Sequence, residues 1–153
     1  ESFKIRTAWR KDFFDTLNRI PLFLEVIIMA KVIHTNSAPA AVGPYSQAID
    51  CGDLVFCSGQ IPLVPETGAV VEGGIEAQTR QIFANIQAVL SEAGLSLKNI
   101  VKTTVFMTDL GQFGAFNDVY GWYFPENPPA RSCVEISKLP KGVSVEIEVI
   151  AKR

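Results

Sequence analysis

The segment GVSVEIEVIA, residues 142–151, alternates between apolar and polar side chains through Val149. Successive side chains of an extended strand point to opposite faces of a sheet. One face therefore carries Val143, Val145, Ile147 and Val149, and the other carries Ser144, Glu146 and Glu148. This pattern predicts a strand that packs its apolar face on helices and directs two carboxylates to the other face. The chain is thereby constrained to a sheet with helices on one face.

The remaining elements agree with an α+β domain. Apolar residues recur at helical spacing between Gly74 and Ala93, which predicts a helix, and Gly94 suits a left-handed C-terminal cap. A second helix is predicted between Asp109, a candidate N-cap, and Pro125. Strands are predicted at residues 31–35, as two runs within 47–59, and at 99–109, 130–136 and 142–151. This order favours two helices on one face of a single sheet. The other face then needs a cover, and a second copy of the chain is the economical choice.

Composition excludes several classes of protein. The chain has 153 residues, a size typical of one domain, with 48% apolar and 20% charged residues. Its net charge of −2 and pI of about 5.4 argue against duplex nucleic acid or an anionic membrane as a partner. Three cysteines and one histidine match no disulfide framework and no zinc pattern. We therefore expect no metal or heme, no membrane span, and a reducing compartment, the cytoplasm.

The first 28 residues differ in composition from the rest. Basic residues precede an apolar stretch from Ile20 to Met29, as in a targeting peptide, but acidic residues and Pro21 fit such a peptide poorly. We expect Met29 to be the natural start. Residues 1–28 are then an upstream or expression-derived extension, and residues 29–153 form the domain.

The segment NPPARSCVEI, residues 127–136, places a cation beside a thiol. Alternation puts Arg131, Cys133 and Glu135 on one face of the predicted strand. If the last two strands pair, Arg131 and Glu146 can lie on the same face. A rim ion pair between them contributes less than about 1 kcal/mol. The alternative is a pocket in which Arg131 binds a carboxylate bidentately while Glu146 handles a proton or a water.

Other polar residues each allow a structural and a functional interpretation. Asn117 is either a satisfied core amide or a ligand, and Tyr45, after a Gly-Pro turn, either packs ordinarily or covers a pocket. Ser58-Gly59 ends a strand, so Gly59 is either a turn glycine or a point where a ligand approaches the backbone. No histidine is placed to activate Cys133, which we expect to be a packing or pocket-lining residue.

Several separated motifs resemble one family in matching order. They are SAPAAVGPYSQAI, SGQIPL, QTRQIFANIQAVLSEAGLSLKNIVKTTVFMTDL, FNDVY, PPARSCVEI and LPKGVSVEIEVIA. From about Lys31 to the C-terminus the chain resembles the reactive intermediate deaminase family, the RidA-type or YjgF-like proteins, also called the L-PSP endoribonuclease family. The resemblance implies a chorismate-mutase-like α+β fold with a mixed sheet, and a homotrimer with clefts between subunits. It also implies cofactor-free hydrolysis of 2-aminoacrylate and 2-iminobutanoate to 2-keto acids and ammonia.

The resemblance assigns roles to individual positions. Arg131 corresponds to the arginine that binds the substrate carboxylate, and Glu146 to the glutamate that orients the attacking water. The remaining substrate-binding positions are Tyr45, Ser58, Gly59, Asn117 and Cys133, the last through its backbone N–H. Two alternatives stay open: an endoribonuclease or translation inhibitor, and a keto-acid-binding or chaperone-like module without turnover.

Overall fold

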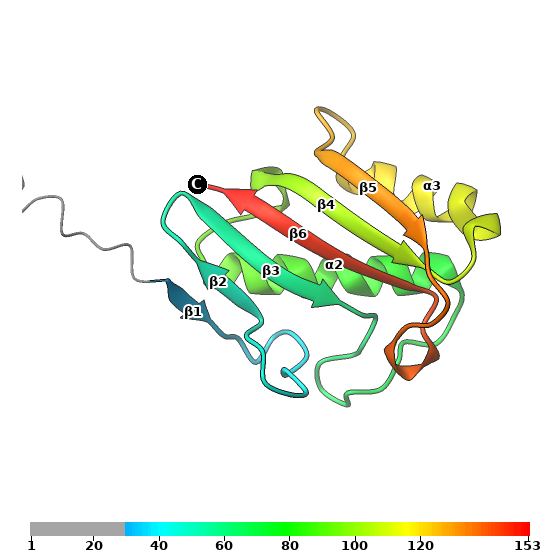
Figure 1. Ribbon diagram of the computed structural model, residues 1–153, viewed down its shortest axis with the longest axis horizontal. Helices are drawn as coiled ribbons and strands as arrows, with labels where there is room; N and C mark the ends of the chain where they lie inside the picture. Colours follow the sequence, from blue (N-terminus) through cyan, green and yellow to red (C-terminus); the bar gives the residue numbers. More distant parts are fainter. Residues whose placement is uncertain (1–29) are drawn as a thin grey trace, which may run out of the picture.

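The computed structural model describes residues 30–153, and the predicted extension at residues 1–28 and the start at Met29 lie outside them. A single mixed sheet runs through the molecule in the order β1-β2-β3-β6-β4-β5 (Figure 1). The strands are β1 (Lys31–Ile33), β2 (Ala48–Asp50), β3 (Leu54–Gln60), β4 (Ile100–Met107), β5 (Ala130–Glu135) and β6 (Val145–Lys152). Neighbouring strands are antiparallel except β4 and β5, which are parallel.

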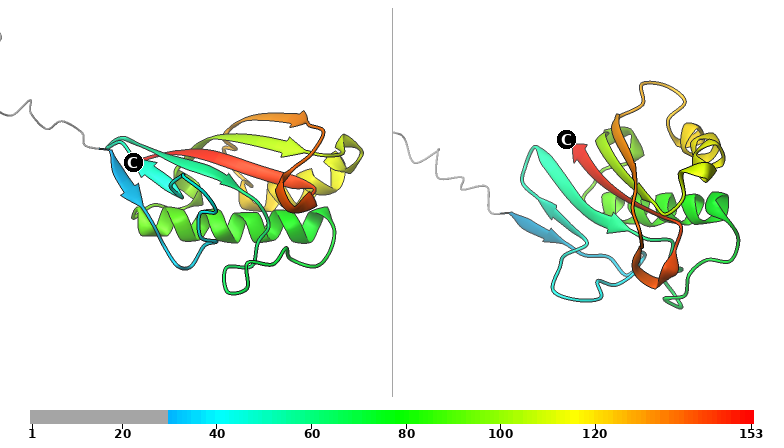
Figure 2. Two further views of the ribbon diagram at one scale, coloured as in Figure 1. Left: turned by 60° about the horizontal axis from the view of Figure 1, so that its bottom comes forward. Right: turned by 45° about the vertical axis from the view of Figure 1, so that its right-hand side comes forward.

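Two helices, α2 (Ile75–Glu92) and α3 (Phe113–Tyr123), cover the same face of the sheet (Figure 2). The apolar stripe of α2 is fully buried at Ile82, Phe83 and Ile86. The helix ends as its sequence predicts, because Gly94 adopts φ +73° and the Leu95 N–H bonds to the Leu90 carbonyl at 2.8 Å. The predicted α+β architecture with both helices on one face is confirmed.

Among residues 30–153 there are also three short 3₁₀ turns, η2 (Leu97–Asn99), η3 (Leu110–Gln112) and η4 (Pro140–Gly142). Asp109 caps η3, which leads into α3, by accepting a hydrogen bond from the Gly111 N–H at 2.8 Å. This confirms the predicted capping role of Asp109.

The predicted pairing of the last two strands is wrong. β4 lies between β5 and β6, and η4 carries the chain past the end of β4. The register aligns Arg131 with Thr103 and Val149, whose side chains are fully or almost fully buried beneath the helices. Arg131 therefore points to the helix face, whereas Glu146, opposite Phe106, points to the other face.

The face without helices, here called the open face, carries apolar side chains. The register places Val32, Ile49, Phe56 and Ile150 in one row across four strands. Val32 is 58% exposed and Phe56 is 43% exposed. Within the described residues this row has no cover, as expected for a surface that another chain can pack against. None of the helices described is long and apolar enough to cross a membrane.

Candidate functional site

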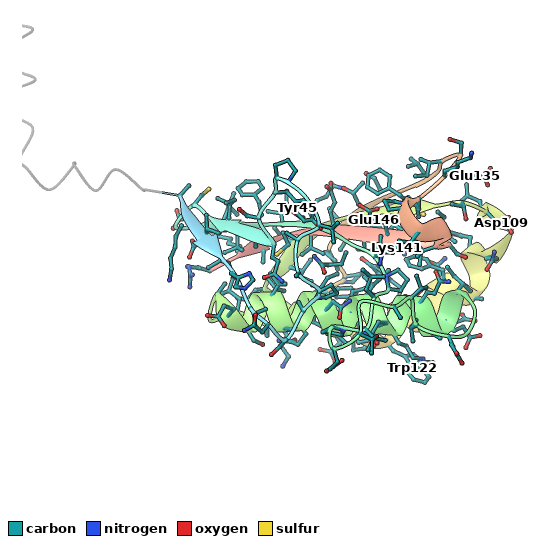
Figure 3. The ribbon with its side chains drawn as sticks, turned by 90° about the horizontal axis from the view of Figure 1, so that it is seen from below. Tyr45, Asp109, Trp122, Glu135, Lys141 and Glu146 are labelled. Atoms are coloured by element: carbon teal, nitrogen blue, oxygen red, sulfur yellow. The ribbon has the colours of Figure 1, made fainter. Side chains whose placement is uncertain are left out.

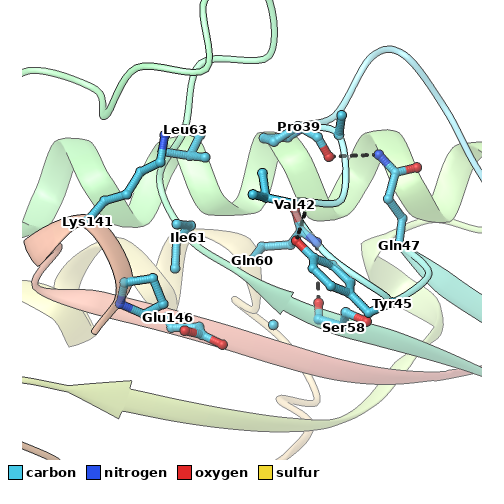
Figure 4. A pocket seen from close by; sticks show the side chains of 13 residues that line it. Pro39, Val42, Tyr45, Gln47, Ser58, Gln60, Ile61, Leu63, Lys141 and Glu146 are labelled. Atoms are coloured by element: carbon cyan, nitrogen blue, oxygen red, sulfur yellow. Dashed lines mark hydrogen bonds between the residues drawn. The ribbon is translucent and has the colours of Figure 1, made fainter. Parts of the chain in front are cut away.

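A cavity of about 460 Å³ opens beside the end of β3 (Figure 4). Four of the predicted site residues line it: Tyr45, Ser58, Gly59 and Glu146. Figure 3 shows Tyr45 and Glu146 on the side of the sheet away from α2. The rest of its lining is largely apolar and includes Val42, Ile61 and Leu63. The cavity thus combines one carboxylate with apolar walls, as small-molecule sites commonly do.

Glu146 reaches into this cavity because Gly59 leaves room for it. The ladder between β3 and β6 is irregular from Cys57 to Gln60, so Gly59 comes close to the Glu146 side chain. A Cβ atom on Gly59 would overlap Glu146 Oε1 and would lie 2.9 Å from Cδ. The absence of a side chain at Gly59 therefore accommodates a carboxylate of the same protein, and its predicted role in ligand approach remains a prediction.

The environment of Glu146 favours its protonated form. The side chain is half-buried, and burial raises the pKa of the carboxyl group above its ordinary value. The carboxylate of Glu148, two residues along the same face of β6, raises that pKa further. A carboxyl group with a raised pKa is a better proton acceptor near neutral pH than an ordinary one, which suits general acid–base chemistry.

Tyr45 and Ser58 form the part of the cavity opposite η4. Tyr45 is half-exposed, and its hydroxyl accepts a hydrogen bond from the Val42 N–H at 3.3 Å. Ser58 Oγ donates to the Ser46 carbonyl at 2.6 Å. The Ser58 hydroxyl therefore ties β3 to the segment that carries Tyr45, while one of its lone pairs remains available.

Arg131 lies in a second hollow, of about 510 Å³, lined also by Asn117, Tyr120 and Pro129. Its Nη1 donates to Asn117 Oδ1 at 2.8 Å, and its guanidinium carbon lies 4.5 Å from the centre of the Tyr120 ring. Asn117 is half-buried as predicted, and its carbonyl oxygen binds the guanidinium. These contacts fix the orientation of a planar cation that has several N–H groups left to donate.

The rim ion pair between Arg131 and Glu146 does not exist, because the two side chains lie on opposite faces of the sheet. Within residues 30–153 the only ion pair joins Arg153 to Asp50. Arg131 thus has no carboxylate partner in this part of the chain. A guanidinium oriented by neutral contacts can bind an incoming carboxylate.

Cys133 lies on the helix face and packs against the core, next to Arg131 along β5. Burial raises the pKa of its thiol, although the Arg131 charge opposes this effect. A thiol with a raised pKa is a poor nucleophile. Cys133 thus packs against the core, which is one of the two alternatives given for it, and the role of its backbone N–H remains a prediction.

The sequence interpretation missed two features of the cavity. Lys141, which was not among the predicted site residues, lines the cavity and adopts φ +57°. Its Nζ donates to the Gly68 carbonyl at 2.9 Å and so joins two loops at the rim. The buried amide of Gln47 also lines the cavity. The Lys-Gly pair after a proline was a usable signal for the first feature, whereas nothing local identified Gln47.

The described residues contain no group of three or more His, Cys, Asp or Glu side chains placed to hold a metal ion. The candidate site therefore consists of a cavity that contains the Glu146 carboxylate and a hollow that contains Arg131, on opposite faces of the sheet.

Comparison with known proteins identifies the family. The chain belongs to the Endoribonuclease L-PSP family, whose model matches residues 35–153. It is 53% identical over 124 residues to a RutC family protein of Pyrococcus abyssi, covering 80% of this chain and 98% of the relative. It is 52% identical over 128 residues to the 2-iminobutanoate/2-iminopropanoate deaminase of Salmonella typhimurium, covering 82% and 99%. The predicted resemblance to the RidA-type and YjgF-like proteins is confirmed.

Solved structures agree with this assignment. The structure of Escherichia coli TdcF with bound serine matches with a TM-score of 0.77 and 46% sequence identity. The match covers 80% of this chain and 98% of that one. The fold described above is therefore the fold of the YjgF-like proteins.

Proposed function

We propose that the protein hydrolyses 2-imino acids, and their enamine tautomers, to 2-keto acids and ammonia. The observation that carries this proposal is that the protein has both an arginine without a carboxylate partner among residues 30–153 and a half-buried glutamate whose pKa is raised. The first can bind a substrate carboxylate and the second can move protons. The name of the Salmonella typhimurium relative, at 52% identity, supports the same reaction. The substrates we propose are 2-aminoacrylate and 2-iminobutanoate.

Arg131 and Glu146 can act on the same substrate only if subunits assemble. In one subunit Arg131 and Glu146 lie on opposite faces of the sheet, so they cannot act together on one small substrate. We propose a homotrimer in which the arginine hollow of one subunit meets the glutamate cavity of the next, giving three equivalent clefts. The exposed apolar row on the open face, with Phe56 43% and Val32 58% exposed, supports such packing.

The reaction balances without a cofactor. The Arg131 guanidinium binds the substrate carboxylate and fixes the imine carbon near a water on Glu146. The Glu146 carboxylate takes a proton from that water as its oxygen bonds to the imine carbon, and the imine nitrogen gains a proton to give a carbinolamine. The protonated Glu146 then assists proton transfer to the amine. As the carbon–nitrogen bond breaks and ammonia leaves, the carbinolamine hydroxyl releases its proton to solvent, which replaces the proton that the imine nitrogen took from solvent, and a 2-keto acid remains.

Arg131→Ala tests the carboxylate contact. Loss of charge-assisted hydrogen bonds worth about 1.5–3 kcal/mol each should lower kcat/KM by roughly 100-fold or more. The assay generates 2-iminobutanoate with a threonine dehydratase and subtracts the spontaneous hydrolysis rate. Sedimentation of the variant serves as the control for an intact assembly. Hydrolysis at the wild-type rate by the variant would exclude Arg131 from the site.

Mixing subunits tests the assembly. Arg131→Ala and Glu146→Ala subunits are each expected to be inactive, and co-refolding them in equal amounts leaves about one cleft in four with both residues intact. Recovery of about a quarter of the wild-type activity supports a shared cleft. No recovery in a mixed trimer would contradict it.

The family description includes an endoribonuclease, so RNA cleavage is a second candidate. The net charge of −2 argues against an extended phosphate-binding surface. Cleavage of RNA by the purified protein that disappears in Glu146→Ala would favour this candidate. A keto-acid-binding module without turnover is distinguished by binding of 2-oxobutanoate in the absence of any acceleration of imine hydrolysis.

The free thiols Cys51, Cys57 and Cys133 support a reducing compartment, and we propose the cytoplasm.

A further inference from the structure

One wall of the glutamate cavity is an irregular segment, here called the Tyr45 loop, residues 35–45. It supplies Pro39, Ala40, Val42 and Tyr45 to the cavity lining. The hydrogen bonds of the Val42 and Tyr45 N–H groups stay inside the loop, with the Tyr45 hydroxyl and the Gly43 carbonyl as their acceptors. The loop contains no helix or strand, so no ladder holds it in place. Its position must depend on other contacts.

The side chain of Gln47 supplies those contacts. Its Oε1 accepts from the Thr35 N–H at 2.7 Å. Its Nε2 donates to the carbonyls of Thr35 at 3.0 Å, Pro39 at 2.8 Å and Ala38 at 3.4 Å (Figure 4 draws the bond to Pro39). Within residues 30–153 these are the hydrogen bonds that join residues 35–45 to the rest of the protein, and directly after the loop the Ser46 carbonyl accepts a hydrogen bond from Ser58 Oγ. Ala38, which is 3% exposed, adds an apolar anchor.

Gln47 is also fixed on its other side. It is 2% exposed, directly precedes β2, and its backbone carbonyl accepts from the Ser58 N–H at 3.0 Å. Ser58 belongs to β3 and lines the same cavity. One buried residue therefore connects the loop that carries Tyr45 to the strand that carries Ser58 and Gly59. Buried hydrogen bonds of this kind strongly restrict the geometry of the groups they join.

We propose that Gln47 is a positioning residue whose buried carboxamide holds the Tyr45 loop as one wall of the Glu146 cavity and thereby sets how tightly the site binds its substrate. Gln47 itself acts through the loop, since its polar side-chain atoms are used by the backbone of residues 35, 38 and 39. The effect on substrate binding rests on the proposed deaminase function. The effect on the loop can be measured without it.

Asn85 provides a matched comparison. It is 1% exposed on α2, and its Nδ2 donates to the Leu63 carbonyl at 2.9 Å and to the Ile61 carbonyl at 3.4 Å. It therefore holds the wall formed by residues 61 and 63, which lies apart from the Tyr45 loop in sequence. Replacing the carboxamide by a carboxylate should therefore loosen the Tyr45 loop when it is done at Gln47, and the wall formed by residues 61 and 63 when it is done at Asn85.

The first experiment measures amide hydrogen exchange in wild-type protein, Gln47→Glu and Asn85→Asp. Gln47→Glu keeps an acceptor for the Thr35 N–H but turns an oxygen toward three carbonyls in place of the NH₂ group. We expect faster exchange at Val42 and Tyr45 in Gln47→Glu, with the amides of β6 unchanged, and no such change in Asn85→Asp. Unchanged exchange in the Tyr45 loop of a folded Gln47→Glu protein would overturn the proposal. Gln47→Met, which buries no charge, replaces this variant if Gln47→Glu does not fold.

The second experiment measures steady-state kinetics with 2-iminobutanoate. Losing these buried hydrogen bonds should raise KM about tenfold while kcat stays within about twofold, because Glu146 lies on β6, outside the Tyr45 loop. Partial unfolding would instead lower kcat at unchanged KM, which separates positioning from a loss of folded protein. Gln87→Glu, on α2 away from the cavity, is the control expected to match the wild type. An unchanged KM despite faster loop exchange would refute the proposed effect on binding.

If the wild-type protein does not accelerate imine hydrolysis, the proposed function is wrong and hydrogen exchange alone decides the role of Gln47. Faster exchange confined to the Tyr45 loop then supports the structural part of the proposal, and unchanged exchange overturns it.

Discussion

Gly59→Ala tests how Glu146 is held in its cavity. A Cβ atom at this position would overlap Glu146 Oε1, and it would lie 2.9 Å from Cδ and 3.1 Å from Cγ. The Glu146 side chain can rotate away, because it ends in a flexible carboxyl group and is only half-buried. We therefore expect a small loss of stability and a large loss of activity.

The magnitude follows from the overlap. Relieving it requires the carboxylate to move by on the order of 1 Å, and a misplacement of that size can cost about 100-fold in rate, or roughly 2.7 kcal/mol of transition-state stabilisation. Moving a flexible side chain costs the folded state roughly 1–2 kcal/mol at most, within the usual range for one substitution. A loss of activity that is large compared with the loss of folding stability indicates a displaced carboxylate and not a damaged fold.

The assay is a double-mutant cycle on kcat/KM with 2-iminobutanoate as substrate. If Gly59→Ala acts through Glu146, it should cost about 100-fold in the wild-type background and almost nothing in a Glu146→Gln background. Gly114→Ala is the control, because a Cβ there meets nothing within 4 Å. Equal losses in both backgrounds would refute the reasoning, since Gly59 would then act independently of Glu146.

Two further predictions concern charge. Arg131 Nη1 donates to the amide oxygen of Asn117 at 2.8 Å, so Asn117→Asp should place a carboxylate against the guanidinium. We expect KM to rise about tenfold or more, because this carboxylate competes with that of the substrate, and the melting temperature to stay the same or rise. An unchanged KM would contradict the role of Arg131. Because the pKa of Glu146 is raised in the folded state by burial and by Glu148, its stabilising contribution is present below the ordinary value of 4.5 and is lost as pH rises through the folded-state pKa. The Glu146→Gln variant should therefore melt at a higher temperature than the wild type at pH 7. Thermal scans at several pH values should show this difference in melting temperature becoming smaller toward pH 4. A constant difference across this range would be inconsistent with the raised pKa of Glu146.

Local sequence determined the elements and the identity of the chemical groups. The helical stripe of α2 and the alternation of β6 each follow from side-chain periodicity, which depends only on neighbouring residues. The left-handed cap at Gly94 and the cap at Asp109 follow from local backbone chemistry. Glu146 was assigned to the face without helices from this alternation alone, and the structure agrees.

Tertiary structure decided where Arg131 points. Its strand, β5, lies at the edge of the sheet and buries none of its side chains completely, so its own alternation did not identify the helix face. That face was fixed by pairing with β4, which lies about 30 residues earlier in the chain and is parallel to β5. A short connection does not force adjacent pairing, and a shift of one residue in register moves every side chain to the opposite face. The sequence by itself therefore singled out Arg131 and Glu146 as the candidate carboxylate-binding and proton-handling groups, whereas only the strand order placed them on two faces of the sheet.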